Sequence, residues 1–509
     1  MPEHLRALVV ILVLAGTVFA FARAPLTAAL IAPADFIRRR NLWLALTLTA
    51  FLAHNFWLYI VIGAVLLAVA ARADSNRVAL ALFVLLAIPP INDRIGAFGL
   101  VNYLFDIDHL RLVSLAVLLP AFLAPAAPGE RLLDGAPGRL LLGYAALNVV
   151  LAAPEASATG TARAAFLAFI DVIVPYAVAS RLTRTLEAQR SAAASYVAGA
   201  AVMAAIGAFE IARHWLLYSS LPVVYGIKFG GEYLMRDEAL RATATSGQAI
   251  PFGFALAIAF ALTLGLRPGF PGRASWLAAL GLLALGMIAS FSRGPWVGAL
   301  VGALVFVLTG PGAMRVLARL AIGGGALALV AIATPLGDRL LHPVTVEGGS
   351  YAYRQRVIEA ALNQILEHPW LGNADFIYAP EIQELKQGQG IIDIVNTYAG
   401  IGLASGLVGL ALFIGVFATA MLALWRRVRA EPEGSDARAL GRGLLAAMAC
   451  MLVTIGTVSS ISAIPITCYL LAGLASGYAL RARPAEQALP SMPAILPPLA
   501  RAVGHTGGR

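Results

Sequence analysis

Charged residues are scarce in this sequence: they occupy 13% of its 509 positions, whereas hydrophobic residues occupy 60%. A water-soluble protein of this length needs far more polar surface, so the composition excludes that class. Apolar runs of about 17–25 residues recur along the chain, which is the length that crosses a bilayer as a helix. Strands of a membrane barrel are shorter and alternate in polarity. The sequence therefore predicts an all-α, polytopic transmembrane helix bundle.

Cysteine and histidine are also few. The two cysteines, Cys450 and Cys468, lie inside apolar runs, which excludes a disulfide framework. The seven histidines lack the pairs at helical spacing that zinc sites use. The chain has neither a phosphate-binding glycine-rich loop with a lysine nor a nucleophile elbow. We therefore expect no metal and no cofactor.

The apolar runs predict about 12 to 14 crossings in one membrane-embedded domain, residues 1–481. The run at 42–71 is too long for one crossing and holds His54 and Asn55 in its middle, so it is either two short helices or one tilted, broken helix. The first run resembles a signal peptide, but the spans after it favour an uncleaved helix. The predicted spans are 5–22, 42–71, 76–90, 108–124, 138–153, 164–181, 192–212, 247–266, 275–291, 294–310, 316–334, 395–425, 443–460 and 462–481.

The basic residues concentrate in short connections such as Arg38 to Arg40 and 426–442. Short loops rich in Lys and Arg mark the cytoplasmic side of a membrane protein. Topology thus explains the net charge of +10, and we expect no nucleic acid partner. This orientation directs the loops 213–246 and 335–393 outwards and leaves 482–509 as a disordered cytoplasmic tail.

The loop 335–393 is the largest polar segment and is expected to lie in the periplasm. Within it, Tyr351 to His368 has the spacing of an amphipathic helix, with Ile358, Ala361, Leu362 and Ile365 on one face. Docking of that face on the membrane domain directs Arg354 inwards and Arg356 towards water. A guanidinium suits a phosphate because its planar fork donates two hydrogen bonds, although pairing of Arg354 with a neighbouring carboxylate explains it equally well.

Two further arginines lie beside predicted spans. Arg293 stands in the turn Ser292-Arg293-Gly294, where it binds an anion or serves as an ordinary membrane-surface anchor next to Trp296. Arg241 precedes a span within a segment of small and hydroxyl residues, which suits a ligand site or a capped helix start. All three arginine-bearing segments fall on the same predicted face.

Three acidic residues lie within or beside predicted spans. Asp171 lies in the middle of a predicted span, where a carboxylate marks a functional site or a buried structural pair. Asp106 and Asp108 have the spacing of a metal-binding pair in soluble sugar-nucleotide transferases. The chain shows no nucleotide-binding domain, so we interpret that pair as coincidental.

Several short motifs, taken in order, resemble the O-antigen ligase and polymerase superfamily. An arginine opens a loop helix that ends near a Pro-x-x-Gly turn, and an Asn-x-Tyr segment and a Gly-Leu-x-Gly stretch enter the next span. The Ser292-Arg293-Gly294 turn and the Arg241 segment resemble two further features of that family. The matching segments are Tyr353-Arg354-Gln355-Arg356, Ile365 to Gly372, Val395 to Tyr398, and Ser405 to Leu410.

The resemblance implies a metal-independent glycosyltransferase of the bacterial inner membrane. Its donor is a glycan on undecaprenyl pyrophosphate, and its other expected partners are membrane lipids and a chain-length regulator. Arg241 and Arg354 then hold the pyrophosphate, with Arg293 as a third cation. The remaining candidates for substrate binding are Arg356, Gln387, Gln389 and Asn396, although 387–390 also suits a flexible turn.

The sequence departs from the family at one position. Val395 stands where ligases that join glycan to lipid A core commonly have a histidine, the proposed general base. His368 and Asp393 are the nearest substitutes in the sequence. This departure favours a polymerase of O-antigen or exopolysaccharide repeat units over a ligase acting on lipid A core or protein. A transporter or flippase of lipid-linked sugars is the alternative from another class, but it predicts several ionisable groups at mid-membrane rather than one polar outer loop.

Overall fold

The protein is an all-α, polytopic membrane protein, as the sequence predicted. The computed structural model describes residues 1–96, 102–125, 133–153, 157–227, 235–236, 239–318, 348–386 and 392–481. Within these ranges, seven helices are long and apolar enough to cross a membrane, and five more apolar helices have 10–17 residues. The proposed tail at 482–509 and most of the predicted span at 316–334 lie outside the described residues.

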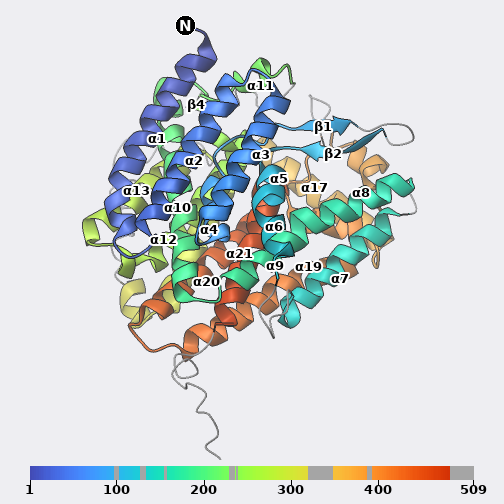
Figure 1. Ribbon diagram of the computed structural model, residues 1–509. Helices are drawn as coiled ribbons and strands as arrows, with labels where there is room; N and C mark the ends of the chain where they lie inside the picture. Colours follow the sequence, from blue (N-terminus) through green and yellow to red (C-terminus); the bar gives the residue numbers. More distant parts are fainter. Residues whose placement is uncertain are drawn as a thin grey trace, which may run out of the picture.

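The helices form a bundle, with two short antiparallel hairpins and α11 towards its upper end in Figure 1. Its first half contains α1 (Glu3–Thr27), α2 (Pro33–Leu52), α3 (Phe56–Ala73), α4 (Arg77–Val84), β1 (Asp93–Gly96), β2 (Tyr103–Ile107), α5 (His109–Val113), η1 (Ser114–Leu118), α6 (Leu119–Leu123), α7 (Gly135–Ala152), α8 (Ala158–Ala168), η2 (Phe169–Ile173), α9 (Val174–Leu182) and α10 (Leu186–Arg213). Its second half contains α11 (Leu221–Val224), β3 (Met235–Arg236), β4 (Ala239–Leu240), η3 (Ala244–Ser246), α12 (Ala249–Gly265), η4 (Arg267–Gly269), α13 (Arg273–Ala289), α14 (Arg293–Leu308), α17 (Gly348–Glu367), η5 (Phe376–Tyr378), α18 (Pro380–Gln383), α19 (Thr397–Ala430), α20 (Asp436–Ile455) and α21 (Ile464–Ala479).

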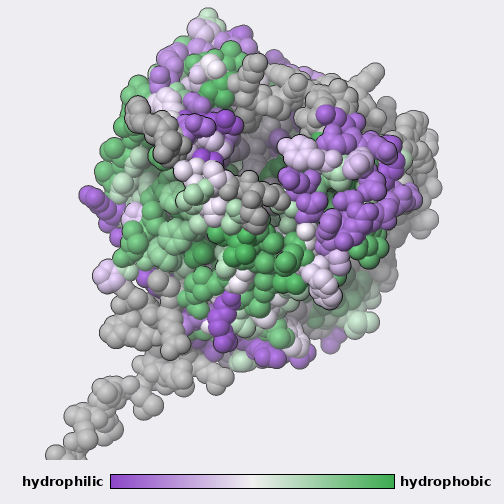
Figure 2. Space-filling model, turned by 90° about the vertical axis from the view of Figure 1, so that its right-hand side faces the viewer, coloured by the Kyte–Doolittle hydropathy of each residue, from purple (hydrophilic) through white to green (hydrophobic). Residues whose placement is uncertain are grey.

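The surface has the polarity of a membrane protein. Figure 2 shows a cluster of hydrophilic residues towards the upper right of one face and a broad apolar region below it. Large apolar side chains are exposed on several long helices, for example Val61 on α3 and Ile414 on α19. Both cysteines are buried, with Cys450 0% and Cys468 4% exposed.

The long apolar run at 42–71 is divided into two helices. His54 takes a left-handed conformation with φ of 50°, and the Asn55 side chain accepts a hydrogen bond of 3.0 Å from the Leu58 amide at the start of α3. A positive φ cannot continue a right-handed helix, and Asn is a preferred N-cap residue. The polar pair that interrupts the hydrophobic pattern therefore marks the end of one helix and the cap of the next.

The predicted span at 76–90 is wrong in its extent. Helix α4 has only eight residues, and the chain leaves it before Pro89 and Pro90. Every residue from Val78 to Ile88 is buried within the bundle. An apolar run that is enclosed by other helices has the same composition as a lipid-facing span, so hydropathy alone could not separate the two.

Arg39 lies inside α2 rather than in a short connection, which corrects the sequence interpretation of Arg38 to Arg40. Its side chain is fully buried, and its guanidinium donates to both carboxylate oxygens of Asp74 at 2.9 and 2.6 Å. The same guanidinium donates to Ser191 and Ser195 of α10 at 3.0 and 2.8 Å. A buried charge needs such full pairing, and the network ties α2 and α10 to the connection between α3 and α4.

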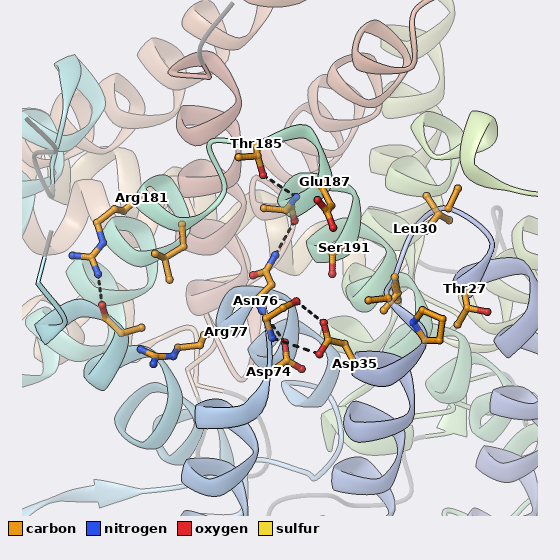
Figure 3. A pocket seen from close by; sticks show the side chains of 18 of the residues that line it. Thr27, Leu30, Asp35, Asp74, Asn76, Arg77, Arg181, Thr185, Glu187 and Ser191 are labelled. Carbon is orange, nitrogen blue, oxygen red and sulfur yellow. Dashed lines mark hydrogen bonds between the residues drawn. The ribbon is translucent and has the colours of Figure 1, made fainter. Parts of the chain in front are cut away.

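A cavity of about 750 Å³ lies next to this network. In Figure 3, Asp35, Asp74 and Asn76 cluster near the centre of the view, and Arg181 lies apart from them. Helix α10 begins close to this cavity, because Glu187 and Ser191 line it. The 28 residues of α10 rise about 1.5 Å each, so its far end lies about 40 Å away.

A kink in α19 receives the turn that follows α17. Gly406 has φ of 63° and ψ of −168°, which interrupts the helical hydrogen bonds. The Leu407 and Val408 amides donate instead to the Pro369 and Trp370 carbonyls, at 2.8 and 3.2 Å, and the Asn373 amide donates to the Leu403 carbonyl at 2.8 Å. The Pro-x-x-Gly turn and the Gly-Leu-x-Gly stretch of the sequence therefore form one structural unit.

Glycine is required on both sides of this contact. Gly372 has φ of 69°, and a Cβ there would collide with the backbone of α19; a Cβ on Gly406 would collide with the backbone of Trp370. We expect Gly406→Ala to cost about 1–3 kcal/mol through backbone strain alone. Its melting temperature in detergent, followed by tryptophan fluorescence, should fall by several degrees.

Gly400→Ala provides the matched control on the same helix. A Cβ at position 400 meets only Ile394, at 3.9 Å, which is ordinary van der Waals contact. Equal melting temperatures for the two variants would contradict the proposed role of the kink.

Candidate functional site

Two of the predicted arginine segments meet in the structure. The Arg241 guanidinium donates to the Ser290 carbonyl at 3.3 Å through Nε and to Ser292 Oγ at 2.8 Å through Nη2. The neighbouring Ala242 amide donates to the Ala289 carbonyl at 3.1 Å. Arg241 thus lies against the turn between α13 and α14, whose first helical residue is Arg293. We call this end of the bundle the arginine end.

A buried carboxylate holds the segment that follows Arg241. Glu210, in the last turns of α10, is 0% exposed. Its Oε1 accepts from the Leu217 amide at 3.0 Å, and its Oε2 accepts from the Thr243 and Ala244 amides at 3.0 and 2.9 Å. Ala244 has φ of 43°, a conformation that a non-glycine residue adopts only when its surroundings impose it.

Glu210 was not predicted as a site residue, although the sequence contains a signal for it. This residue is a lone carboxylate in the predicted span 192–212, and an ionisable group within a span marks a functional or structural site. The sequence could not show that its partners are backbone amides, because two of the three belong to a segment more than thirty residues away.

The loop between α20 and α21, residues 456–463, packs against the turn that carries Arg293. A Cβ on Gly294 would collide with Thr457 Oγ1, so the Ser-Arg-Gly turn needs glycine after its arginine. The same loop reaches the Arg241 segment, where Ser462 Oγ donates to the Ser246 carbonyl at 3.2 Å.

The 456–463 loop also holds the end of the large polar loop. Ser459 Oγ donates to the Asp393 carboxylate, and Thr397 Oγ1 donates to the Val458 carbonyl at 2.8 Å. Tyr353 of α17 extends the connection, because its hydroxyl donates to the Asp393 carbonyl at 3.1 Å and lies 3.3 Å from the Asp393 amide. Arg354 follows directly, so all three arginine segments connect to one loop.

The buried face of α17 matches the predicted one only in part, because Ala361 and Ile365 pack against the small core as predicted, whereas Ile358 and Leu362 do not. Ile358 and Leu362 are 45% and 54% exposed, whereas Val357 and Ala361 are each 1% exposed and contact a small core with Ile382 and Leu403. The prediction assumed that the larger apolar side chains must be buried in protein. Exposed apolar side chains carry no such penalty where lipid is the surrounding medium. Arg354 is nevertheless partly buried and Arg356 exposed, as predicted.

The two candidates for the general base lie far apart. Asp393 is bonded to Ser459 and Tyr353 near the first turn of α17, whereas His368 is an exposed residue just past its last turn. Fifteen residues separate Tyr353 from His368, which corresponds to about 22 Å along a helix. The structure therefore places Asp393, and not His368, beside the 456–463 loop.

The remaining candidates divide in two. Asn396 is the N-cap of α19, and its side-chain oxygen accepts from the Tyr398 and Ala399 amides at 2.9 and 3.2 Å. That contact explains Asn396 by helix capping, independently of any substrate. Gln387 and Gln389 lie outside the described residues.

A polar cavity of about 420 Å³ opens beside the Arg241 segment. Ser246 and Gln248 from the start of α12 line one side, and Ser460 and Ser462 from the 456–463 loop line another. The other lining residues come from β2, from the connections on either side of the β1–β2 hairpin, and from α5, η2 and α21. They are Pro90, Asn92, Asp106, Asp108, Leu110, Arg111, Asp171, Pro465 and Ile466.

Asp171 forms an ion pair within the lining of this cavity. Arg111 Nη2 lies 3.0 Å from Asp171 Oδ2, and Arg111 Nε donates to the same carboxylate at 3.1 Å. The side chains are 24% and 29% exposed, so the pair is accessible from the cavity. Asp171 is therefore structurally paired, one of the two alternatives that the sequence left open, and its side chain also remains accessible.

Comparison with known proteins identifies the segment around these residues. Residues 278–414 match the family model described as O-antigen ligase, and this range contains Arg293, Arg354 and the α19 kink. The chain is also 31% identical over 150 residues to an O-antigen ligase of Pseudomonas aeruginosa strain PAO1, an alignment that covers 30% of this chain and 35% of the relative. The aligned part thus spans about a third of that relative's length. With the motif order and the helical membrane fold, these matches show that residues 278–414 are similar to the O-antigen ligase family.

Proposed function

We propose that this protein transfers a glycan from undecaprenyl pyrophosphate to an acceptor hydroxyl at the arginine end. The observation that carries this proposal is the common attachment of the Arg241, Arg293 and Arg354 segments to the 456–463 loop. Similarity of residues 278–414 to the O-antigen ligase family supports glycosyl transfer within a multi-pass bacterial membrane protein. In this proposal the arginine end lies at the periplasmic surface of the inner membrane, which is where the lipid-linked donor is presented.

The chemistry requires cations at the leaving group. The acceptor oxygen attacks the anomeric carbon, the bond from that carbon to the pyrophosphate oxygen breaks, and the hydroxyl proton passes to a base. Fixed guanidinium groups stabilise the negative charge that develops on the departing pyrophosphate. Arg241 suits this role because Ser292 and the Ser290 carbonyl orient it. Asp393 is the better candidate for the base, since it lies beside the 456–463 loop.

The acceptor defines two versions of this function. Val395 in place of a histidine favours a polymerase, which extends repeat units and works with a chain-length regulator. The relative from Pseudomonas aeruginosa is named a ligase, and a ligase fits at least as well. A deletion strain separates the two: finished polymer accumulating on the lipid carrier indicates a ligase, whereas missing long chains indicate a polymerase.

Loss of an arginine should abolish most of the activity. We expect Arg241→Ala and Arg354→Ala each to lower turnover of the lipid-linked glycan by about 10²–10³-fold, the usual cost of removing one donor to a developing anion. Turnover is measured with purified protein in liposomes. Arg139→Ala is the control, because that exposed arginine donates to the Gly135 carbonyl at the start of α7 and touches none of the three segments. Full activity in both arginine variants would rule out the proposed pyrophosphate site.

Glu210 should act through Arg241. In Glu210→Gln one oxygen becomes an amide nitrogen that cannot accept from a backbone amide, so the Arg241 segment loses part of its support. We expect kcat/KM to fall by at least about fivefold, since an unsatisfied buried group costs about 1–3 kcal/mol. The double variant Glu210→Gln/Arg241→Ala should be little worse than Arg241→Ala alone, because both changes affect one interaction. Independent, multiplicative losses would show that Glu210 supports folding only.

A further inference from the structure

The polar cavity contains groups that neither the pyrophosphate nor the arginine segments use. Its volume of about 420 Å³ falls within the usual range of small-molecule sites. Three of its residues are carboxylates, three are serines and two are amides, alongside Arg111. Gln248 and Asn92 are exposed, and within the part of the chain that the structure describes the Gln248 side chain makes no capping hydrogen bond to α12. A cavity lined by this many hydrogen-bonding side chains suits a ligand that carries several hydroxyl groups.

The Arg111–Asp171 pair is the most unusual part of the lining. Both residues belong to helices that are locally wound as π-helix: Asp171 lies within η2, and η1 begins three residues after Arg111. Single π-turns inside α-helices occur frequently at functional sites, because they turn a side chain away from its regular direction. Asp171 also lies within the apolar span Ala158–Leu182, where a charge needs a specific reason.

The position of the cavity relates it to the donor. Ser246 and Gln248 follow Arg241 within the segment that Glu210 holds, and Ser462 donates to the Ser246 carbonyl. A sugar attached to a pyrophosphate at Arg241 therefore has polar groups within reach on the same segment. The cavity lies on the side of that segment that faces α5, η2 and α21.

We propose that this cavity binds the sugar ring next to the pyrophosphate of the lipid-linked donor, with Asp171 and Gln248 as hydrogen-bonding residues. Arg111 holds the Asp171 carboxylate in place and remains accessible to a sugar hydroxyl. This inference rests on the proposed function, because it assumes that the donor carries a pyrophosphate. It adds a binding site for the carbohydrate.

The charge of the lining limits the kind of sugar. Asp106, Asp108 and Asp171 face one cavity, and Arg111 is the basic residue of its lining. Arg94 offsets Asp106 only weakly, at 3.5 Å and 71% exposed. A carboxylate on the sugar would meet this negative lining at short range. The site therefore suits an uncharged or amino sugar and disfavours a uronic acid.

The test compares two ligands on the full-length protein in detergent. One is undecaprenyl pyrophosphate, and the other is the lipid-linked glycan extracted from a strain that lacks the protein. We expect Asp171→Asn to weaken binding of the glycan-bearing lipid by about tenfold or more, since a hydrogen bond to a charged group is lost, and to leave undecaprenyl pyrophosphate within twofold. Gln248→Ala should also weaken binding of the glycan-bearing lipid relative to undecaprenyl pyrophosphate. Because Gln248 is exposed, this substitution should not disturb folding.

Asp134→Asn is the matched control. Asp134 pairs with Arg184 at 2.8 Å, both side chains are 23% exposed, and the pair lies near the opposite end of the bundle. This variant should leave both affinities unchanged. Equal weakening of both ligands by Asp171→Asn, or no change in either with Gln248→Ala, would overturn the sugar site while the arginine site stands. Failure of the unmodified protein to bind undecaprenyl pyrophosphate would instead refute the proposed function.

Discussion

Backbone groups that leave a helix within a membrane protein must find a partner, because the surrounding lipid offers none. The arginine end meets this constraint with side chains. Glu210 accepts from three amides, and Ser462 and Thr397 donate to backbone carbonyls. All of these bonds except the one from Leu217 join segments that are distant in sequence, so satisfying the backbone also fixes where the arginines stand. The hydrogen bonds that stabilise the non-helical segments of the arginine end are therefore the same ones that position its arginines.

The kink in α19 obeys the same constraint by another route. Gly406 breaks the helix, and the turn at Pro369 to Gly372 supplies the carbonyls that the helix no longer provides. The close approach of two backbones is possible only because neither glycine carries a Cβ. This contact fixes one end of α17, and the hydrogen bonds of Tyr353 fix its other end beside Asp393. Arg354 is thereby held on a helix that is anchored twice.

The sequence was informative where a local pattern had one physical meaning. His54 and Asn55 interrupt an apolar run, and a helix break follows directly from their polarity and capping preference. The three arginine segments, which the sequence placed on one face, also connect to the same 456–463 loop in the structure. The sequence was uninformative where lipid and protein interior have similar polarity, which is why the burial of Ile358 and Leu362 and the extent of the 76–90 run were predicted wrongly. The roles of Glu210 and of the Arg111–Asp171 pair depend on contacts between residues far apart in the chain, which cannot be recognised in a single sequence.

The burial of both native thiols has a practical consequence for orienting this protein in its membrane. Cys450 and Cys468 are enclosed among packed helices, and such thiols react slowly with water-soluble maleimides. A reporter thiol placed at Trp370, which is 71% exposed, would then be labelled against a low background without first removing the native residues. Intact cells and opened vesicles would give different labelling according to the side on which that position lies.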